Sequence, residues 1–224
     1  IENLEATNIE MSLDRILASV ESVAEMNVLE NQLNNAAPDI YFRTTPAVLV
    51  SVDGEPKLKK VEDSKLEYVF NTPFFIVKSG DNYFLYGNDN WYKSKEVITK
   101  EWKPTKKVPK EVEKLAKKKF EDKDQKDALK SKDKTPPMII AVSKPSELVL
   151  TNGAPEYEPI KKTALLYVTN SESDIIMDIN LQEHFLLLNG RWYRSKSLAD
   201  GDWKFSEPDT LPEDFSKIPA DGSS

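Results

Sequence analysis

Two stretches of the chain decide its fold, "NDNWYKSKEVITKEW" from Asn88 to Trp102 and "NGRWYRSKSLADGDW" from Asn189 to Trp203. Each begins with a polar turn, continues with an adjacent Trp-Tyr pair and ends on a second Trp. All four tryptophans of the protein lie in these two stretches. The first question is therefore whether these rings form a binding surface or fill a core.

The chain carries an internal duplication, which becomes visible when the sequence is laid over itself. An offset of 99 residues aligns Pro46 with Pro145 and continues through the turns that follow. A two-residue insertion in the second copy then raises the offset to 101. At that offset "WYKSK", which begins at Trp91, lies over "WYRSK", which begins at Trp192.

Each copy has the residue pattern of short β-strands separated by turns. The runs "DIYFRTTPAVLVSV" and "MIIAVSKPSELVLT" are rich in β-branched and apolar residues, and one Pro interrupts each of them. The dipeptides Asp53-Gly54 and Asn152-Gly153 are typical of tight turns. The sequence therefore predicts a mainly β protein (α+β overall) with two homologous small antiparallel β-modules, each a meander of about five strands.

Two segments stand outside this pattern. Apolar residues at helical spacing over 12–33 predict an amphipathic N-terminal helix. Lysine-rich sequence follows the first copy, with thirteen Lys and seven Asp or Glu over 103–134, and its start has helical spacing. The predicted domains are an N-terminal segment with the helix at 1–37, β-repeat 1 at 38–112, a charged, partly helical connector at 113–136, β-repeat 2 at 137–219 and a disordered tail at 220–224.

Composition narrows the functional classes. The 224 residues carry a net charge of −7, no Cys and a single His, so thiolate chemistry and multi-histidine metal sites are excluded. The basic segment interleaves Lys with Glu and Asp, which favours a solvated helix or linker over a nucleic-acid surface. No apolar run approaches the roughly 20 residues of a membrane span. The first residues read like the middle of a longer protein, without a signal peptide.

No catalytic residue, metal site or cofactor site emerges from the sequence, and we expect a protein that is not an enzyme. His184 aligns with Tyr83 of the first copy, so we interpret it as a strand residue, neither a ligand nor a base. Glu172 and Asp174 in "NSESDI" have no carboxylate counterpart in the first copy, and we interpret this stretch as a solvated loop.

Several motifs in order resemble a known group of proteins. The stretches "SLDRILAS", "TTPAVLVSVDGEP", "VFNTPFF", "LLYVTNSESDI", "LLNGRWYRSKSLADGDW" and "LPEDFSKIP" are similar to large bacterial repeat proteins often labelled carbohydrate-binding proteins of family V/XII. The resemblance covers about 12–219. It implies a non-catalytic binding module of a bacterial envelope or surface protein. It favours the cell envelope or secretion over the cytoplasm, while the compartment itself stays open.

The carbohydrate label of that group corresponds to a small chitin-binding motif with an Asn-Gly turn, a Tyr-bearing strand and a downstream Trp. Asn189, Gly190, Tyr193 and Trp203 match this motif in the second copy. In the first copy Asn88, Tyr92 and Trp102 match it, with Asp89 in place of the glycine. The resemblance therefore implies carbohydrate as the ligand class.

The candidate ligand-binding residues are aromatic, because a π-face stacks on the flat C–H face of a sugar ring. They are Trp91, Tyr92, Trp102, Trp192, Tyr193 and Trp203. A second interpretation remains open, in which these rings fill the thin cores of small β-modules and the chain is a structural scaffold or protein-interaction repeat. The expected partner is accordingly a polysaccharide or another protein. Buried rings, or an unpaired strand at a sheet edge, would favour a protein.

Overall fold

The computed structural model describes residues 36–87, 90–120, 135–199 and 201–218. The chain forms two compact units. The first, here called the central unit, comprises residues 46–148. The second, here called the C-terminal unit, comprises the described residues of 36–45 and 149–218. Each unit is mainly β, and each contains one copy of the duplicated meander.

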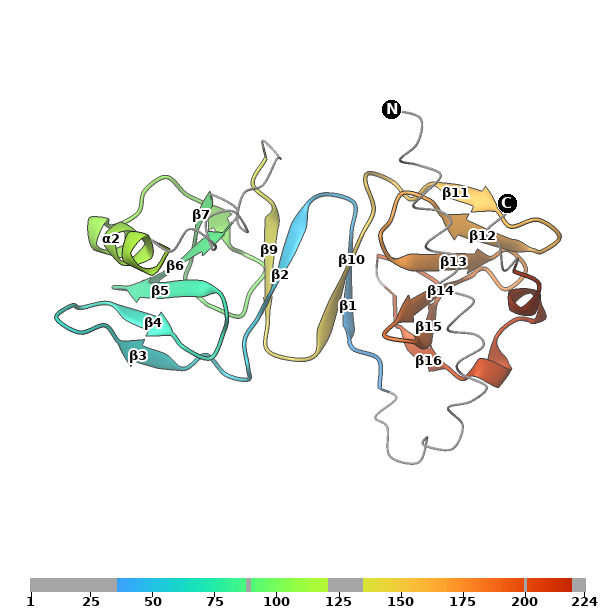
Figure 1. The fold of residues 1–224 in the computed structure, drawn as a ribbon, viewed down its shortest axis with the longest axis horizontal. Coiled ribbons are helices and arrows are strands. Elements are labelled where there is room, and N and C mark those ends of the chain that lie inside the picture. The colour runs from blue at the N-terminus through green and yellow to red at the C-terminus, as the bar shows by residue number, and fades with distance from the viewer. Residues whose placement is uncertain (1–35, 88–89, 121–134, 200, 219–224) are drawn as a thin grey trace. The chain divides into compact units, whose positions relative to one another are not determined.

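The central unit contains a six-stranded antiparallel sheet whose strands lie in sequence order (Figure 1). They are β3 (Leu58–Lys60), β4 (Glu67–Val69), β5 (Phe75–Ser79), β6 (Asn82–Gly87), β7 (Asn90–Ser94) and β8 (Lys103–Pro104). Each strand pairs with the next one along the chain, so the sheet is a meander. Gly80, at φ 58°, makes the tight turn between β5 and β6, in a conformation that glycine adopts without steric strain.

The C-terminal unit repeats this sheet with six strands in the same order (Figure 1). They are β11 (Tyr157–Pro159), β12 (Leu165–Val168), β13 (Asp174–Asp178), β14 (Glu183–Leu188), β15 (Arg191–Ser195) and β16 (Lys204–Ser206). Two 3₁₀ turns follow, η2 (Pro208–Thr210) and η3 (Glu213–Lys217). The inserted residues of the second copy lie in the turn between β13 and β14, where Asp178 Oδ1 accepts bonds from the N–H groups of Asn180 and Leu181.

The two copies exchange their first strands. Four strands precede the meanders: β1 (Asp39–Arg43) and β2 (Ala47–Ser51) in the first copy, and β9 (Met138–Val142) and β10 (Ser146–Leu150) in the second. β2 pairs in parallel with β9, and β1 pairs with β10. The central unit is therefore completed by β9 of the second copy, and the C-terminal unit by β1 of the first.

Backbone hydrogen bonds repeat across the exchange at equivalent positions. The N–H of Val52 donates to the carbonyl of Val142 at 2.9 Å, and the N–H of Thr151 donates to the carbonyl of Arg43 at 3.1 Å. Each member of the second bond lies 99 positions from its counterpart in the first. The equivalence of these bonds means that both copies use the same ladder geometry with the other copy's strand.

An asparagine side chain fixes the first turn of each meander. Asn71 Nδ2 donates to the carbonyls of Asp53 and Glu55 at 2.7 and 2.9 Å, and its Oδ1 accepts from the N–H of Lys57 at 2.8 Å. Asn170 makes the corresponding three bonds in the second copy, at 3.1, 2.8 and 3.0 Å. One amide thus satisfies three backbone groups of a turn that has no strand partner for them.

Helix α2 (Lys110–Lys119) forms the helical start of the lysine-rich segment. Pro109 precedes the helix, acidic residues lie in its first turn and lysines in its last turn, which suits the helix dipole. Val112 and Ala116 are buried on one face and pack against the central sheet. The lysines of the helix are exposed to solvent. Its amphipathic sequence therefore reflects one face that covers the core and one face that is solvated.

The fold prediction is confirmed, since the chain is mainly β with two homologous antiparallel sheets and one described helix in the connector. The units are grouped differently from the predicted domains, because β1 and β9 join the units of the opposite copies and α2 packs on the central sheet. The predicted N-terminal helix and the predicted tail at 220–224 lie outside the described residues.

Candidate functional site

The adjacent Trp-Tyr pairs lie on β7 and β15, the fifth of the six strands in each sheet. Successive residues of a strand point to opposite faces, so the two rings of each pair are directed to different sides. In the central sheet Trp91 is the partner of Tyr86 on β6, and Tyr92 is the partner of Leu85. Whether a ring is exposed to a ligand therefore depends on what packs against its face of the sheet.

The β2–β9 pair covers the face of the central sheet that carries Tyr92. Tyr92 is 1% exposed and shares a buried cluster with Val50 of β2 and Ile139 of β9. Trp102 belongs to the same cluster, and its Nε1–H donates to the carbonyl of Val97 at 3.1 Å. The hydroxyl of Tyr92 is buried without a partner among the described residues, and burial raises its pKa.

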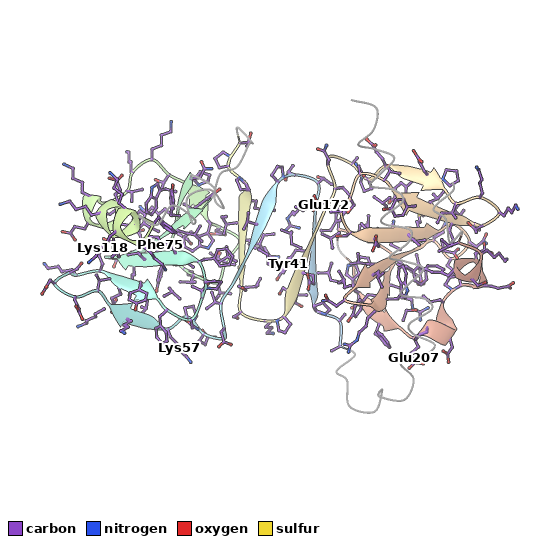
Figure 2. All side chains as sticks on the ribbon, viewed as in Figure 1. Tyr41, Lys57, Phe75, Lys118, Glu172 and Glu207 are labelled. Carbon is purple, nitrogen blue, oxygen red and sulfur yellow. The ribbon has the colours of Figure 1, made fainter. Side chains whose placement is uncertain are left out.

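Helix α2 covers the opposite face of the central sheet, where Trp91 lies. Phe75 lies beside α2, the helix that carries Lys118 (Figure 2). Trp91 is half-buried there, with its ring centroid 6.2 Å from Phe75 and 4.9 Å from Tyr86. Phe120, just after the helix, contacts both Phe75 and Tyr86. Trp91 is consequently part of an aromatic cluster beneath a helix.

In the C-terminal unit the same two faces are covered by different elements. Trp192 is 1% exposed and packs edge-on against Phe215 of η3, with ring centroids 5.2 Å apart and planes at 89°. Tyr193 and Trp203 lie on the other face in a cluster that includes Phe42 of the exchanged strand β1. They are 4% and 8% exposed, respectively. The exchanged strand therefore helps to bury the two aromatic residues of the second copy that match the chitin-binding motif.

Five of the six candidate aromatic residues are buried and the sixth, Trp91, is half-buried. The alternation of strand residues predicts that one ring of each pair faces inward and the other outward. This prediction was wrong for Trp192 and Tyr193, because both faces of that sheet are covered. The sequence contains signals for both covering segments. Residues 110–119 have amphipathic helical spacing, and Phe215 and Ile218 are apolar residues near the C-terminus. The alternation of side chains along a strand assigns each ring to one face of the sheet. Only the tertiary structure shows which segment packs on that face.

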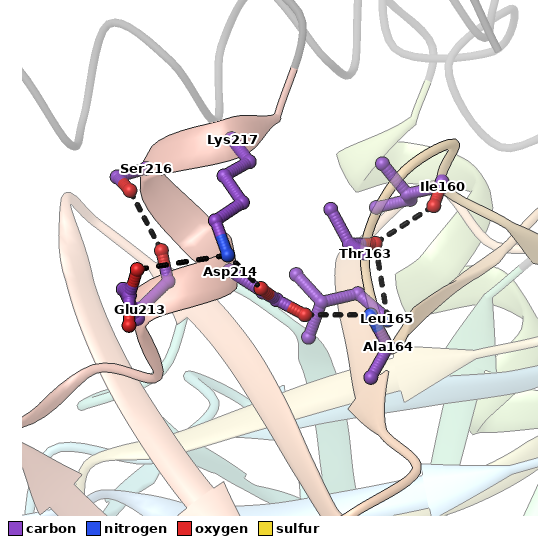
Figure 3. Close-up of polar contacts among 8 residues, drawn as sticks. All are labelled: Ile160, Thr163, Ala164, Leu165, Glu213, Asp214, Ser216 and Lys217. Carbon is purple, nitrogen blue, oxygen red and sulfur yellow. Dashed lines mark hydrogen bonds and ion pairs between the residues drawn. The ribbon is translucent and has the colours of Figure 1, made fainter.

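The C-terminal segment is fastened to the sheet by a carboxylate. Asp214 Oδ2 accepts the N–H of Ala164 at 2.6 Å, and Asp214 Oδ1 accepts from Lys217 Nζ at 2.7 Å (Figure 3). The hydrogen bond from Lys217 is the main cause that lowers the pKa of Asp214, and the same bond raises the pKa of Lys217. This contact positions η3, whose Phe215 covers Trp192.

His184 lies on β14, as predicted for a strand residue, and is buried. Its Nε2 shares a hydrogen bond of 3.0 Å with the hydroxyl of Tyr157 on β11. Burial lowers the pKa of His184 and raises that of Tyr157. In the first copy Leu58 corresponds to Tyr157 and Tyr83 corresponds to His184. The hydrogen-bonded pair is therefore specific to the second copy.

The loop predicted around Glu172 and Asp174 is shorter than expected. Glu172 is exposed, but Asp174 is the first residue of β13 and is 7% exposed. The interpretation of Asp174 as a solvated loop residue was wrong, because strand pairing with Leu187 brings it into the sheet. Among the described residues no group of three or more His, Asp or Glu is arranged to hold a metal ion.

A polar cleft of about 700 Å³ lies in the central unit, along β7, β8 and the loop between them. No aromatic ring lines it. The charged and amide side chains at its wall are Asn82, Lys93, Lys95, Glu96, Glu101 and Lys103. Apart from the half-buried Asn82, these side chains are exposed, and the three lysines form no ion pair with any described residue.

Hydrogen bonds between side chains and the backbone two residues away stabilise the walls of this cleft. Ser94 Oγ accepts the N–H of Glu96 at 3.2 Å, and Thr99 Oγ1 accepts the N–H of Glu101 at 3.1 Å. The carbonyl of Thr99 accepts the N–H of Ala141 on β9 at 3.1 Å. The loop between β7 and β8 is thus anchored at both its own turns and the exchanged strand, and it covers part of the outer edge of β9.

None of the described helices has the length and hydropathy of a membrane-spanning segment. No protein-family model matches the chain, and no curated protein matches it in a sequence search. The resemblance to the carbohydrate-binding repeat proteins therefore remains a prediction.

Proposed function

We propose that this chain is a non-catalytic protein-interaction repeat, in which the aromatic residues at equivalent positions of the two copies build the cores. The observation that carries the proposal is the burial of Tyr92, Trp102, Trp192, Tyr193 and Trp203 beneath the strands β1, β2 and β9 or beneath η3. A ring that stacks on a sugar must expose one face to it, and these five rings have both faces in contact with protein.

The exchanged strands support the same proposal. A repeat whose first strand completes the unit of the other copy makes each unit depend on both copies, which suits a scaffold. The bacterial envelope or surface setting implied by the resemblance is part of this proposal. It is supported by the motifs alone.

Exposed apolar side chains provide one region for contacts with a partner. Ile179 and Leu181 are 49% and 51% exposed in the lengthened turn between β13 and β14. The first copy has the tight Gly80-Asp81 turn at this place and no such side chains. Exposed apolar groups are common singly on protein surfaces, but two at one hairpin tip increase the apolar area that a partner can cover.

Recognition by strand addition is less suited to this fold than contacts through side chains. The end strands of both sheets are short and carry Lys, Glu or Pro, as in β8 with Lys103 and Pro104 and in β11 with Glu158 and Pro159. Such residues protect sheet edges against pairing with another strand, since proline lacks the N–H and charges resist burial.

Tryptophan fluorescence of the whole chain tests the proposal. We expect blue-shifted emission with little acrylamide quenching, and no change when chitin or cellulose oligosaccharides are added. Trp91→Phe should remove most of the quenchable emission, whereas Trp192→Phe should leave it in place. Red-shifted, quenchable emission that changes with an oligosaccharide would favour the carbohydrate-binding alternative and overturn the proposal.

A further inference from the structure

The polar cleft of the central unit differs in charge from the same place in the C-terminal unit. In the second copy Arg194 and Lys204 stand where the first copy has Lys93 and Lys103. Arg194 lies 3.8 Å from Glu183, and Lys204 lies 3.3 Å from Asp202. The second copy therefore pairs both of these cations with carboxylates, whereas the described part of the first copy supplies no ion-pair partner for Lys93 and Lys103.

One residue accounts for much of this difference. Asn82 stands at the position of Glu183, and an amide cannot neutralise the neighbouring Lys93 as a carboxylate does. Its Oδ1 is buried and has no hydrogen-bond partner among the described residues. The first copy thus holds unpaired ammonium groups in a concave surface. A ligand of opposite charge would neutralise them.

The geometry points to this cleft as a binding site for an acidic peptide segment of another protein, an inference that rests on the proposed protein-interaction function. Carboxylates of the segment pair with Lys93, Lys95 and Lys103, because charge-assisted hydrogen bonds are the strongest polar contacts available there. Glu96 and Glu101 accept hydrogen bonds from its backbone N–H groups. A peptide supplies both carboxylates and N–H groups. A polyanion without N–H donors would be repelled by the carboxylates of Glu96 and Glu101.

The lining also separates a peptide from a neutral sugar. No aromatic ring lines the cleft, so a pyranose ring finds no stacking face there. Pro104 has no N–H to offer at the edge of β8, so the segment is held by side chains and not as an added strand. The lysine side chains are exposed, which makes the attraction sensitive to screening by salt.

Fluorescence anisotropy of the whole chain with a fluorescein-labelled octapeptide of alternating Glu and Gly tests this inference. We expect binding at low ionic strength that weakens as salt is added. Lys93→Ala with Lys103→Ala should weaken it by roughly tenfold, since each exposed ion pair contributes up to about a fivefold effect. Asn82→Glu, which copies the second repeat, should weaken binding by roughly fivefold without removing any lysine.

Matched controls keep the test specific to the cleft. Lys59→Ala with Lys144→Ala removes the same charge from exposed positions outside it and should leave binding within about twofold of the unmodified chain. Glu183→Asn frees Arg194, the equivalent of Lys93, and should raise the number of bound peptides. The same peptide with Gln in place of Glu should not bind.

Several outcomes would overturn the inference. These are the absence of binding to the Glu peptide at low salt, equal losses in the cleft and control variants, or tighter binding of polygalacturonate than of a peptide of equal charge. If tryptophan emission is protected and unmoved by sugars while the peptide does not bind, the protein-interaction proposal stands and the cleft is not its site. If the emission moves with sugar, the function itself is wrong.

Discussion

Val48 of the first copy and Ile139 of the second are direct partners in the parallel β2–β9 ladder, and both side chains pack on the same core cluster. Residues 91 positions apart in the chain thus share one small sheet. The pairing makes the central unit dependent on both copies. Its consequences can be measured because the chain contains no cysteine of its own.

Ala47→Cys with Met138→Cys should form a disulfide within one chain on mild oxidation. The two residues are partners at the end of the ladder, and Met138 is 43% exposed. Adjacent strands lie about 4.8 Å apart, within the range of roughly 4.4–6.8 Å that a disulfide requires between Cα atoms. Non-reducing electrophoresis should show a faster monomer band that reducing agent abolishes.

The control for this crosslink uses the same two strands. Ala47→Cys with Val142→Cys places the thiols at opposite ends of the ladder, about 13 Å apart, and should stay reduced. Equal crosslinking of both pairs would contradict the parallel register, and disulfide-linked dimers without the fast monomer would contradict exchange within one chain.

Asn71→Ala should lower the free energy of unfolding by about 1–2 kcal/mol, because three backbone groups lose their partner and turn to water. Asn170→Ala should have a similar effect through its own three bonds. The double variant should show the sum of the two losses, since the sites are far apart in sequence and share no partner. Urea denaturation measures each value, and a loss below about 0.5 kcal/mol for both would show that the amides are dispensable.

Tyr92→Phe should leave stability unchanged or raise it by about 1 kcal/mol. The Tyr92 hydroxyl is buried with no partner among the described residues, so its removal relieves an unsatisfied polar group without leaving a large cavity. Thermal unfolding monitored by circular dichroism measures the change. A loss of more than about 1 kcal/mol would mean that the hydroxyl has a structural partner, such as a bound water.

Asp214→Asn should weaken the attachment of η3 and reduce the dependence of stability on pH in acid. The folded pKa of Asp214 is lowered, mainly by its hydrogen bond from Lys217, so its contribution is present above the ordinary value of 3.8 and is lost as pH falls through the folded value. The unfolding midpoint should therefore fall less between about pH 5 and pH 3 in the variant than in the unmodified chain.

Glu213→Gln is the matched control for this carboxylate. Glu213 also lies near Lys217, at 3.6 Å, but its side chain is 88% exposed, and exposed pairs contribute little. We expect its acid profile to match that of the unmodified chain. An identical change in both variants would assign the effect to general charge and not to the Asp214 contact.

His184→Tyr should remove the pH dependence of stability just below neutrality. Burial lowers the folded pKa of His184 below the ordinary 6.5, so the unfolded chain takes up a proton first and stability falls as pH drops below about 6.5. The chain has one histidine, and Tyr is the residue of the first copy at this position. Urea midpoints at about pH 7.5 and pH 5.5 measure the effect, and an unchanged difference in the variant would contradict it.

Local features of the fold could be predicted because they depend on neighbours in sequence. Each Pro-interrupted run became two consecutive strands, β1 and β2 in the first copy and β9 and β10 in the second. Asp53-Gly54 and Asn152-Gly153 became turns. The helical spacing at the start of the lysine-rich segment became α2. The duplication itself predicted that both sheets would have the same strand order.

The exchange of β1 and β9 was decided only by the tertiary structure. Both copies carry nearly equivalent first strands, so the apolar pattern of "DIYFR" and "MIIAV" fits either partner, and a ladder of backbone hydrogen bonds carries little sequence information. The covering of Trp91 by α2 and of Trp192 by η3 was decided in the same way. Strand alternation assigns each ring to a face, but burial depends on which distant segment packs there, and that is a property of the whole fold.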